Sequence, residues 1–334
     1  MRRSLTVLTA VTAVLLAACG GDDDGGDEQA ESSPSPAAEA SPEATQAEPD
    51  AVTVGVIPIV DVAPIYLGIE QGFFEAQNID VTLESGQGGA AIVPGVVSGE
   101  FEFGFSNITS LLIAQTQGLE LKVVAAGNST TGEEGADFGG VVVLEDSDIQ
   151  DEADLAGKSV AVNTLNNIGT TTINKVVRDA GGDPSTIQYT ELAFPDMPAA
   201  LQGGQVDAVW VVEPFLTITT SQGARPVAWN FAGTDPNLMI AAYFTSQELI
   251  DSNPDLVERF TTAMNESLEY AQDNPDEARQ ILLTYTQLDE AMAETLTLPR
   301  WSAEIDTEPI QLLADLAVED GLVDTDPDVS ALLQ

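Results

Sequence analysis

Short apolar runs alternate with amphipathic segments from residue 51 onward, and this alternation predicts an α/β fold. Strands are predicted over the ranges 51–57, 79–83, 101–105, 121–126, 159–162, 187–191 and 206–212. Helices are predicted between them, over the ranges 64–71, 90–97, 108–115, 169–180 and 197–202. Such a strand–helix rhythm is typical of a mostly parallel sheet with helices on both faces.

The last third of the chain changes to a helical pattern. Asn-Pro pairs at 253–254 and 274–275 each place a helix-capping residue before a first-turn proline. Apolar side chains then recur every four residues, at positions 256, 260, 264 and 268. This spacing predicts a helix with one face buried in the core.

A weak internal repeat indicates two similar lobes. The segments 97–104 and 201–208 each end a helix, turn on glycine and enter a strand. The strands that follow end in Ser106-Asn107 and Glu213-Pro214. Ligands of open α/β sheets lie beyond the carboxyl ends of the strands, so two facing sheets would form a ligand cleft.

The N-terminus has the pattern of a secretory signal. Two arginines at positions 2 and 3 precede the apolar stretch 5–16, which is too short for a permanent membrane span. The following Leu16-Ala17-Ala18-Cys19 is similar to a bacterial lipobox, which implies cleavage after residue 18 and lipid attached to Cys19. An ordinary signal peptide with a chance cysteine is the alternative. Residues 19–50 then predict a lipid anchor and a disordered acidic tether, because 20–50 contain no aromatic residue, Val, Ile or Leu.

Charge and composition exclude several classes of function. The chain has 10 Lys and Arg against 55 Asp and Glu, a net charge of -45, so nucleic acid and anionic membrane surfaces would repel it. It has no His and one Cys, which excludes imidazole or thiolate metal sites and Ser-His-Asp or Cys-His catalysis. We therefore expect no cofactor, no metal and no catalytic residues. Paired acids for glycoside hydrolysis lack a supporting motif. We interpret the excess of acidic residues as a highly charged surface that stays hydrated, and the protein soluble, in a salty habitat.

Five short motifs in order carry a resemblance to a known family. They are GVIP at 55–58, APIY at 63–66, EQGFF at 70–74, DLAGK at 154–158 and GQVDA at 204–208. With these motifs the region 52–323 resembles the nitrate, sulfonate and thiamine-precursor group of solute-binding proteins, which includes SsuA, TauA and THI5-like domains. Gly68 and Glu102 depart from the Ala and Asp that the pattern usually has.

The resemblance implies a type II periplasmic-binding-protein fold. Lobe 1 would comprise 51–144 and 241–334, lobe 2 would comprise 145–240, and the hinge crossings would lie near Val142-Val143 and Ala242-Tyr243. It also implies a monomer, anchored on the extracytoplasmic face of the plasma membrane, that closes on a small solute and delivers it to an ABC permease with its ATPase. No bond is made or broken in this mechanism.

The candidate ligand-binding residues lie at predicted strand ends, helix starts and aromatic positions near the cleft. They are Asp61, Tyr66, Gln87, Gly88, Ser106, Asn107, Thr164, Asn166, Thr170, Phe194, Trp210 and Glu213. Each has a purely structural alternative. Tyr66 would pack on lobe 1, the 86–89 segment would be a plain turn, and the short polar side chains would be helix caps. Phe194 and Trp210 would be buried between the lobes, and Glu213 would cap a helix or form an ion pair.

The candidate set contains no Lys or Arg, which favours a neutral or cationic heteroaromatic ligand such as a thiamine-pyrimidine precursor. A sulfonate, taurine or nitrate would have to rely on backbone amides and helix N-termini, which do bind anions. A sensor that no longer serves transport is a further alternative. The resemblance also extends to a pyrimidine synthase, but that enzyme type relies on histidine and a cysteine-rich motif, which this chain lacks.

Overall fold

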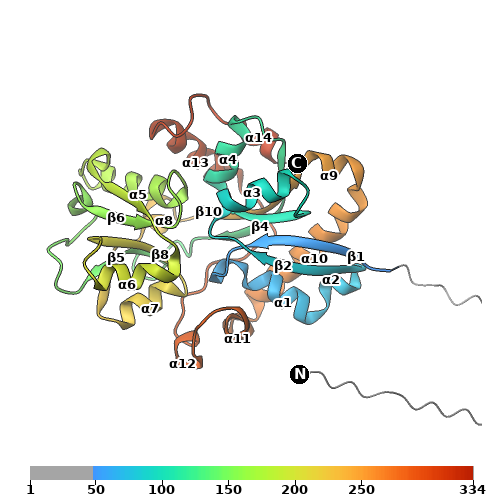
Figure 1. Cartoon of the computed structure of the whole chain (residues 1–334), viewed down its shortest axis with the longest axis horizontal. Coiled ribbons are helices and arrows are strands. Elements are labelled where there is room, and N and C mark those ends of the chain that lie inside the picture. The colour runs from blue at the N-terminus through green and yellow to red at the C-terminus, as the bar shows by residue number, and fades with distance from the viewer. Residues whose placement is uncertain (1–47, 334) are drawn as a thin grey trace, which may run out of the picture. The chain divides into compact units, whose positions relative to one another are not determined.

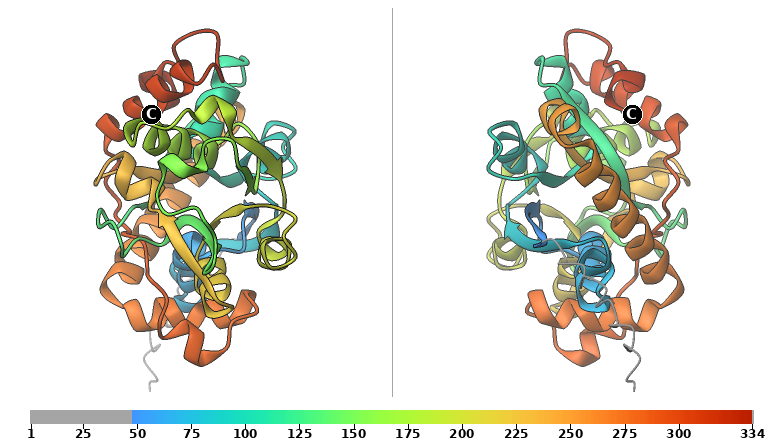
Figure 2. Two further views of the ribbon diagram at one scale, coloured as in Figure 1. Left: turned by 90° about the vertical axis from the view of Figure 1, so that its left-hand side faces the viewer. Right: turned by 90° about the vertical axis from the view of Figure 1, so that its right-hand side faces the viewer.

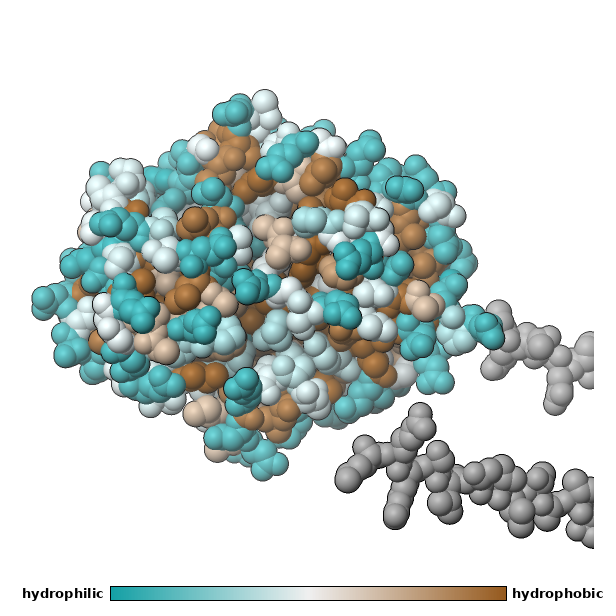
Figure 3. Space-filling view, in the orientation of Figure 1, coloured by the Kyte–Doolittle hydropathy of each residue, from teal (hydrophilic) through white to brown (hydrophobic). Residues whose placement is uncertain are grey.

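The computed structural model describes residues 48–333 (Figures 1 and 2). The predicted signal peptide, the Cys19 lipidation site and nearly all of the predicted tether lie outside the described residues. Over residues 48–333, no helix has the length and hydrophobicity needed to cross a bilayer. The face shown in Figure 3 mixes hydrophilic and hydrophobic residues, and the hydrophobic ones form only small groups.

Two mixed five-stranded sheets form the two lobes. The first has the order β2-β1-β3-β10-β4, in which β10 is antiparallel to both of its neighbours. Its strands are β1 (Asp50–Val56), β2 (Ile79–Ser85), β3 (Phe103–Asn107), β4 (Leu121–Ser129) and β10 (Met239–Ser246). The second has the order β7-β6-β8-β5-β9, in which β5 is antiparallel to both of its neighbours. Its strands are β5 (Gly139–Leu144), β6 (Ser159–Val162), β7 (Gln188–Glu191), β8 (Ala208–Val212) and β9 (Ala224–Ala228).

Helices cover both sheets, and those after β10 surround the first lobe (Figure 1). The helices before β5 are α1 (Ala63–Gln71), α2 (Phe73–Ala76), α3 (Gly89–Val97) and α4 (Ile108–Thr116). Those between β6 and β10 are α5 (Ile168–Asp179), α6 (Met197–Gln202), α7 (Phe215–Ser221) and α8 (Asn230–Thr234). Those after β10 are α9 (Gln247–Ser252), α10 (Pro254–Asp273), α11 (Pro275–Tyr285), α12 (Glu290–Ala293), α13 (Thr307–Glu319) and α14 (Val329–Leu332).

Local sequence signals predicted many of these elements closely. The bounds of β6 and α6 agree with the prediction, and α1 ends at Gly72, whose φ of 80° is left-handed and suits glycine. Asn253 caps α10 by accepting a hydrogen bond from the Leu256 backbone N–H at 3.3 Å. Asn274 was predicted to cap α11, but its side chain donates to the Tyr270 carbonyl instead.

The lobe boundaries differ from the predicted ones. The predicted crossing at 142–143 lies inside β5, which belongs to the second sheet, so the first crossing is the preceding segment 130–138. The predicted crossing at 242–243 lies inside β10 in the first sheet, so the second crossing is 235–238. Both strands pair antiparallel with partners that are distant in sequence, and the local pattern does not reveal this pairing. For the same reason the sheets are mixed rather than mostly parallel.

Arg300 fastens the two crossings to each other. Its guanidinium Nε donates to the Thr130 carbonyl at 2.7 Å, and its Nη2 donates to the Pro236 carbonyl at 2.8 Å. The Arg300 backbone also pairs with Ser129, at the end of β4. The guanidinium group of Arg300 therefore binds both segments that join the lobes.

Gly68 allows the close contact between α1 and α10. A Cβ added at Gly68 would lie 1.9 Å from Ser267 Oγ and 2.9 Å from the Phe74 ring. We expect Gly68→Ala to lower the free energy of unfolding by about 1–3 kcal/mol, because the added methyl group overpacks this contact. Urea denaturation measures the loss. Removing the Ser267 hydroxyl in the double variant Gly68→Ala/Ser267→Ala should recover part of it, and a single variant as stable as the parent would contradict the prediction.

Candidate ligand-binding site

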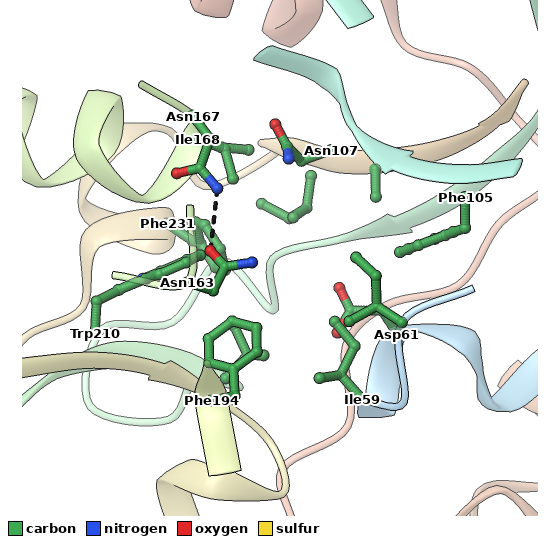
Figure 4. A pocket seen from close by; sticks show the side chains of 14 residues that line it. Ile59, Asp61, Phe105, Asn107, Asn163, Asn167, Ile168, Phe194, Trp210 and Phe231 are labelled. Carbon is green, nitrogen blue, oxygen red and sulfur yellow. Dashed lines mark hydrogen bonds between the residues drawn. The ribbon is translucent and has the colours of Figure 1, made fainter. Parts of the chain in front are cut away.

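A small buried cavity lies where the carboxyl ends of strands from both lobes meet (Figure 4). Its volume is about 30 Å³. The first lobe contributes Ile57, Ile59, Asp61, Phe105, Asn107, Ile240 and Ala241, and the second contributes Asn163, Asn167, Ile168, Phe194, Trp210, Val212 and Phe231. Of the predicted site residues, the structure brings Asp61, Asn107, Phe194 and Trp210 together on this wall.

Asp61 is the acidic group of the cavity. It lies in a 3-10 turn after β1 and is 2% exposed. Its Oδ1 accepts a hydrogen bond from Asn128 Nδ2 at 3.0 Å, whereas its Oδ2 is buried and has no partner within residues 48–333. Burial raises the pKa of Asp61 to about 7, and the nearby Asp137 carboxylate adds to the increase. In Figure 4 the carboxyl group turns toward the space between the lobes.

Three asparagines supply amide groups to the cavity. Asn107 caps α4 by accepting from the Ser110 N–H at 2.9 Å, and Asn167 caps α5 by accepting from the Gly169 N–H at 3.0 Å. Asn167 Nδ2 also donates to Asn163 Oδ1 at 3.1 Å. Asn163 and Asn167 are not among the residues that the sequence predicts for the site. Asn163 directly follows β6, so the strand-end rule that selected Asn107 would have found it.

Aromatic side chains of the second lobe form an apolar wall. Trp210 lies 5.7 Å from Phe194 and 5.8 Å from Phe231, measured between ring centroids. The Trp210 indole N–H donates to Asn230 Oδ1 at 3.1 Å, and a Cβ at Gly169 would come within 2.6 Å of the indole. The indole is therefore held in place on both sides, which suits it as a flat surface for a ring.

Two predicted residues, Gln87 and Gly88, lie at the contact between the lobes rather than on the cavity wall. The Gln87 carbonyl accepts from Asn163 Nδ2 at 3.3 Å. A Cβ at Gly88 would lie 2.5 Å from Thr164 Oγ1. Thr164, another predicted site residue, therefore lies at the same contact between the lobes. These groups hold the lobes together at the edge of the site.

Four predicted residues have structural roles outside the cavity wall. Tyr66 stacks on Tyr285 with ring centroids 3.8 Å apart, as its packing alternative stated. The buried Ser106 hydroxyl donates to the Asn107 carbonyl, and Thr170 completes the capping box of α5. Asn166 occupies a left-handed turn with a φ of 53°.

Glu213 also lies off the cavity wall, although it is 2% exposed. Its carboxylate accepts from the Thr217 N–H at 3.0 Å and from the Thr217 hydroxyl at 2.9 Å. Burial raises the pKa of Glu213 to about 7. The carboxylate therefore caps the start of α7, which is the structural alternative for this residue.

No lysine or arginine is among the described residues that line the cavity. Within residues 48–333, no group of three or more acidic or cysteine side chains is placed to hold a metal ion. The site thus offers one carboxyl group, amides and aromatic faces. This arrangement can accept hydrogen bonds from an N–H group and stack on a flat ring.

Comparison with known proteins agrees with the two-lobe architecture. The family model described as NMT1/THI5 like matches residues 59–278, which is more than half of the chain. The chain belongs to the NMT1/THI5 like family. Its relatives include a Bacillus subtilis (strain 168) protein named for binding aliphatic sulfonates, 23% identical over 70% of each chain. The formylaminopyrimidine-binding protein of Halalkalibacterium halodurans is 22% identical over 66% of this chain and 65% of its own length, just under two thirds.

Solved structures confirm the predicted two-lobe periplasmic-binding-protein fold of this NMT1/THI5 like protein. The alkanesulfonate-binding protein SsuA from Xanthomonas axonopodis pv. citri, bound to MOPS, matches with a TM-score of 0.74 and 20% identity. The match covers 86% of this chain and 99% of that one. The nitrate-binding protein NrtA from Synechocystis PCC 6803 matches with a TM-score of 0.70 and 15% identity, covering 86% of each chain. These relatives are substrate-binding proteins rather than enzymes, as the sequence predicted for this chain.

Proposed function

We propose that the protein is the solute-binding component of an ABC importer, held on the extracytoplasmic face of the plasma membrane by a lipid on Cys19. The family membership and the buried cavity between two lobes support this role. Hinge motion at the crossings 130–138 and 235–238 would open and close the cavity around one small solute. The closed form, in which Asn163 contacts Gln87 across the lobes, would be the form presented to the permease.

The solute that fits best is an amino-substituted nitrogen heterocycle. The observation that carries this choice is the buried Asp61 Oδ2, which has no hydrogen-bond partner among the described residues and lies in a cavity lined by amides and aromatic rings. An exocyclic amino group would donate to this oxygen, and the ring would stack beside Trp210. The formylaminopyrimidine-binding relative supports the same ligand class.

A sulfonate or nitrate is the second candidate. The alkanesulfonate-binding and nitrate-binding relatives favour it, as do the starts of α4 and α5 at the cavity wall. The negative charge of an ionised Asp61 opposes such a ligand, since the lining contains no cation among the described residues. An anion would require Asp61 to be protonated. A sensor without a transport role would use the same cavity, and binding measurements alone do not distinguish it from an importer.

A ligand screen tests the proposed ligand class. Native mass spectrometry and thermal shifts are measured against formylaminopyrimidine and other aminopyrimidines, and against taurine, alkanesulfonates and nitrate. A true ligand at 100 times its Kd adds about 2.7 kcal/mol of stability. We expect this shift from the aminopyrimidines, and a shift from the anions alone would contradict the assignment.

Substitution of Asp61 tests the role of the carboxylate. We expect Asp61→Asn to weaken aminopyrimidine binding about 10- to 100-fold, because it removes a hydrogen bond to a charged group. Isothermal titration calorimetry measures the change. Glu213→Gln is the matched control, since it alters another buried carboxyl group of similarly raised pKa that lies off the cavity wall. Equal losses in both variants would contradict the assignment of Asp61, and anion binding that strengthens in Asp61→Asn would favour the second candidate.

A further inference from the structure

We infer that the binding site continues from the closed cavity into a larger apolar groove, and that the solute carries an apolar extension that lies in this groove. The inference rests on the proposed function and specifies its ligand further. The groove lies between α6–α7 of the second lobe and α11–α12 of the first, on the lower side of the molecule in Figure 1. Its volume is about 680 Å³.

The cavity alone is too small for a ring. A cavity of about 150 Å³ holds benzene, and one water needs about 10–15 Å³. The 30 Å³ between Asp61 and Trp210 therefore corresponds to about two waters. A heterocycle needs several times this volume, so bound solute must displace part of the wall. The side of the wall that faces the groove borders on existing free space.

On each lobe, one pair of contacting residues separates the cavity from the groove. On the second lobe, Phe194 lines the cavity and stacks on Phe215 of the groove, with ring centroids 5.8 Å apart and planes inclined by 12°. On the first lobe, Ile59 lines the cavity, and its carbonyl accepts a hydrogen bond from Tyr285, which lines the groove. Because Phe194 and Phe215 contact each other across this wall, rotation of both rings would join the two spaces.

The lining of the groove selects an apolar occupant. Proline rings at positions 58, 195, 198 and 214 and the side chains of Phe215, Ile218, Leu288 and Met292 dominate it. Asp289 is its one charged residue among those described, and its carboxylate is engaged in capping α12. Because both lobes contribute to the lining, an occupant would stabilise the closed arrangement, as a ligand of the cavity would. A single solute could place a polar head group in the cavity and an apolar extension in the groove.

Two homologous ligand series test the inference. The first is 4-aminopyrimidine with an n-alkyl chain of one, three or six carbons at C5, and the second is the n-alkanesulfonates of the same chain lengths. Calorimetry gives the Kd of each. We expect affinity to rise about two- to fourfold per methylene in the series whose head group binds, because each buried methylene is removed from water.

A pair of substitutions locates the effect. Met292→Glu places a charge in the groove, whereas Ile69→Glu places the same charge at an exposed position of α1, outside both spaces. We expect the affinity of the first variant to stop rising with chain length, whereas the second variant keeps the parent's gain per methylene. A binding head group whose affinity is independent of chain length overturns the groove inference and leaves the proposed function intact. Chain-length dependence in the sulfonates alone overturns the proposed ligand class and supports the groove, and the failure of both series overturns both.

Discussion

Replacement of Asp137 by alanine is expected to lower the free energy of unfolding by about 3–5 kcal/mol. Asp137 lies in the first crossing and is fully buried. Its Oδ1 accepts from the backbone N–H groups of Thr131 at 3.0 Å and Phe138 at 2.9 Å. Its Oδ2 accepts from the Ala232 N–H at 3.1 Å and from the Thr130 hydroxyl.

The size of the loss follows from the donors that alanine leaves without a partner. Each buried donor that loses its acceptor costs about 1–3 kcal/mol, and the carboxylate accepts from three backbone N–H groups and from the hydroxyls of Thr130 and Thr131. Because Ala232 belongs to α8 of the second lobe, the substitution also frees the crossing from that lobe. Urea denaturation should show a lower midpoint with an unchanged slope.

Two controls separate this network from a general effect of removing an acid. Asp137→Asn keeps one acceptor oxygen and should lose less stability than Asp137→Ala. Asp255→Ala removes an aspartate whose side chain is 79% exposed and should change stability by less than about 1 kcal/mol. A loss below 1 kcal/mol in Asp137→Ala would show that the crossing does not depend on this carboxylate.

The parts of the fold that local sequence determines were predictable. Glycine at the end of α1, Asn-Pro at the start of α10 and alternating apolar runs each act within a few residues, and these elements agree with the prediction. Strands β5, β9 and β10 were not predicted, because what establishes them is antiparallel pairing with distant strands. The lobe boundaries depend on this pairing, so they lie before β5 and before β10 rather than at the predicted positions.

The candidate site shows the same division between local and long-range information. Position at a strand end selected Asp61 and Asn107, and the ability of an aromatic ring to stack on a flat ligand selected Phe194 and Trp210. The strand-end rule also selected Glu213, but its carboxylate accepts a hydrogen bond from the backbone N–H of Thr217 in the first turn of α7. Sequence alone does not state whether a carboxylate after a strand turns into the cleft or back onto its own helix. The orientation depends on which backbone donors lie within reach, and the fold determines this.

The pH dependence of stability should identify Asp61 as a buried acid. Its pKa is raised from 3.8 to about 7, mainly by burial, so the folded state prefers the protonated form. The stability that this group contributes is fully present below pH 3.8 and is lost as the pH rises through about 7. At about 1.36 kcal/mol per unit, the loss between pH 5 and pH 8 is about 3 kcal/mol. Asp61→Asn removes the titration, so the variant should lose about 3 kcal/mol less than the parent over this interval, measured by urea denaturation at each pH.

Glu213 has a pKa raised into the same range, so both proteins retain its contribution and the difference between them isolates Asp61. The asparagine keeps an oxygen that can accept from Asn128, and no cation is among the groups that shift the Asp61 pKa. Parallel curves for parent and variant would mean that the pKa of Asp61 is the same in the folded and unfolded protein, which would contradict the burial of this carboxyl group.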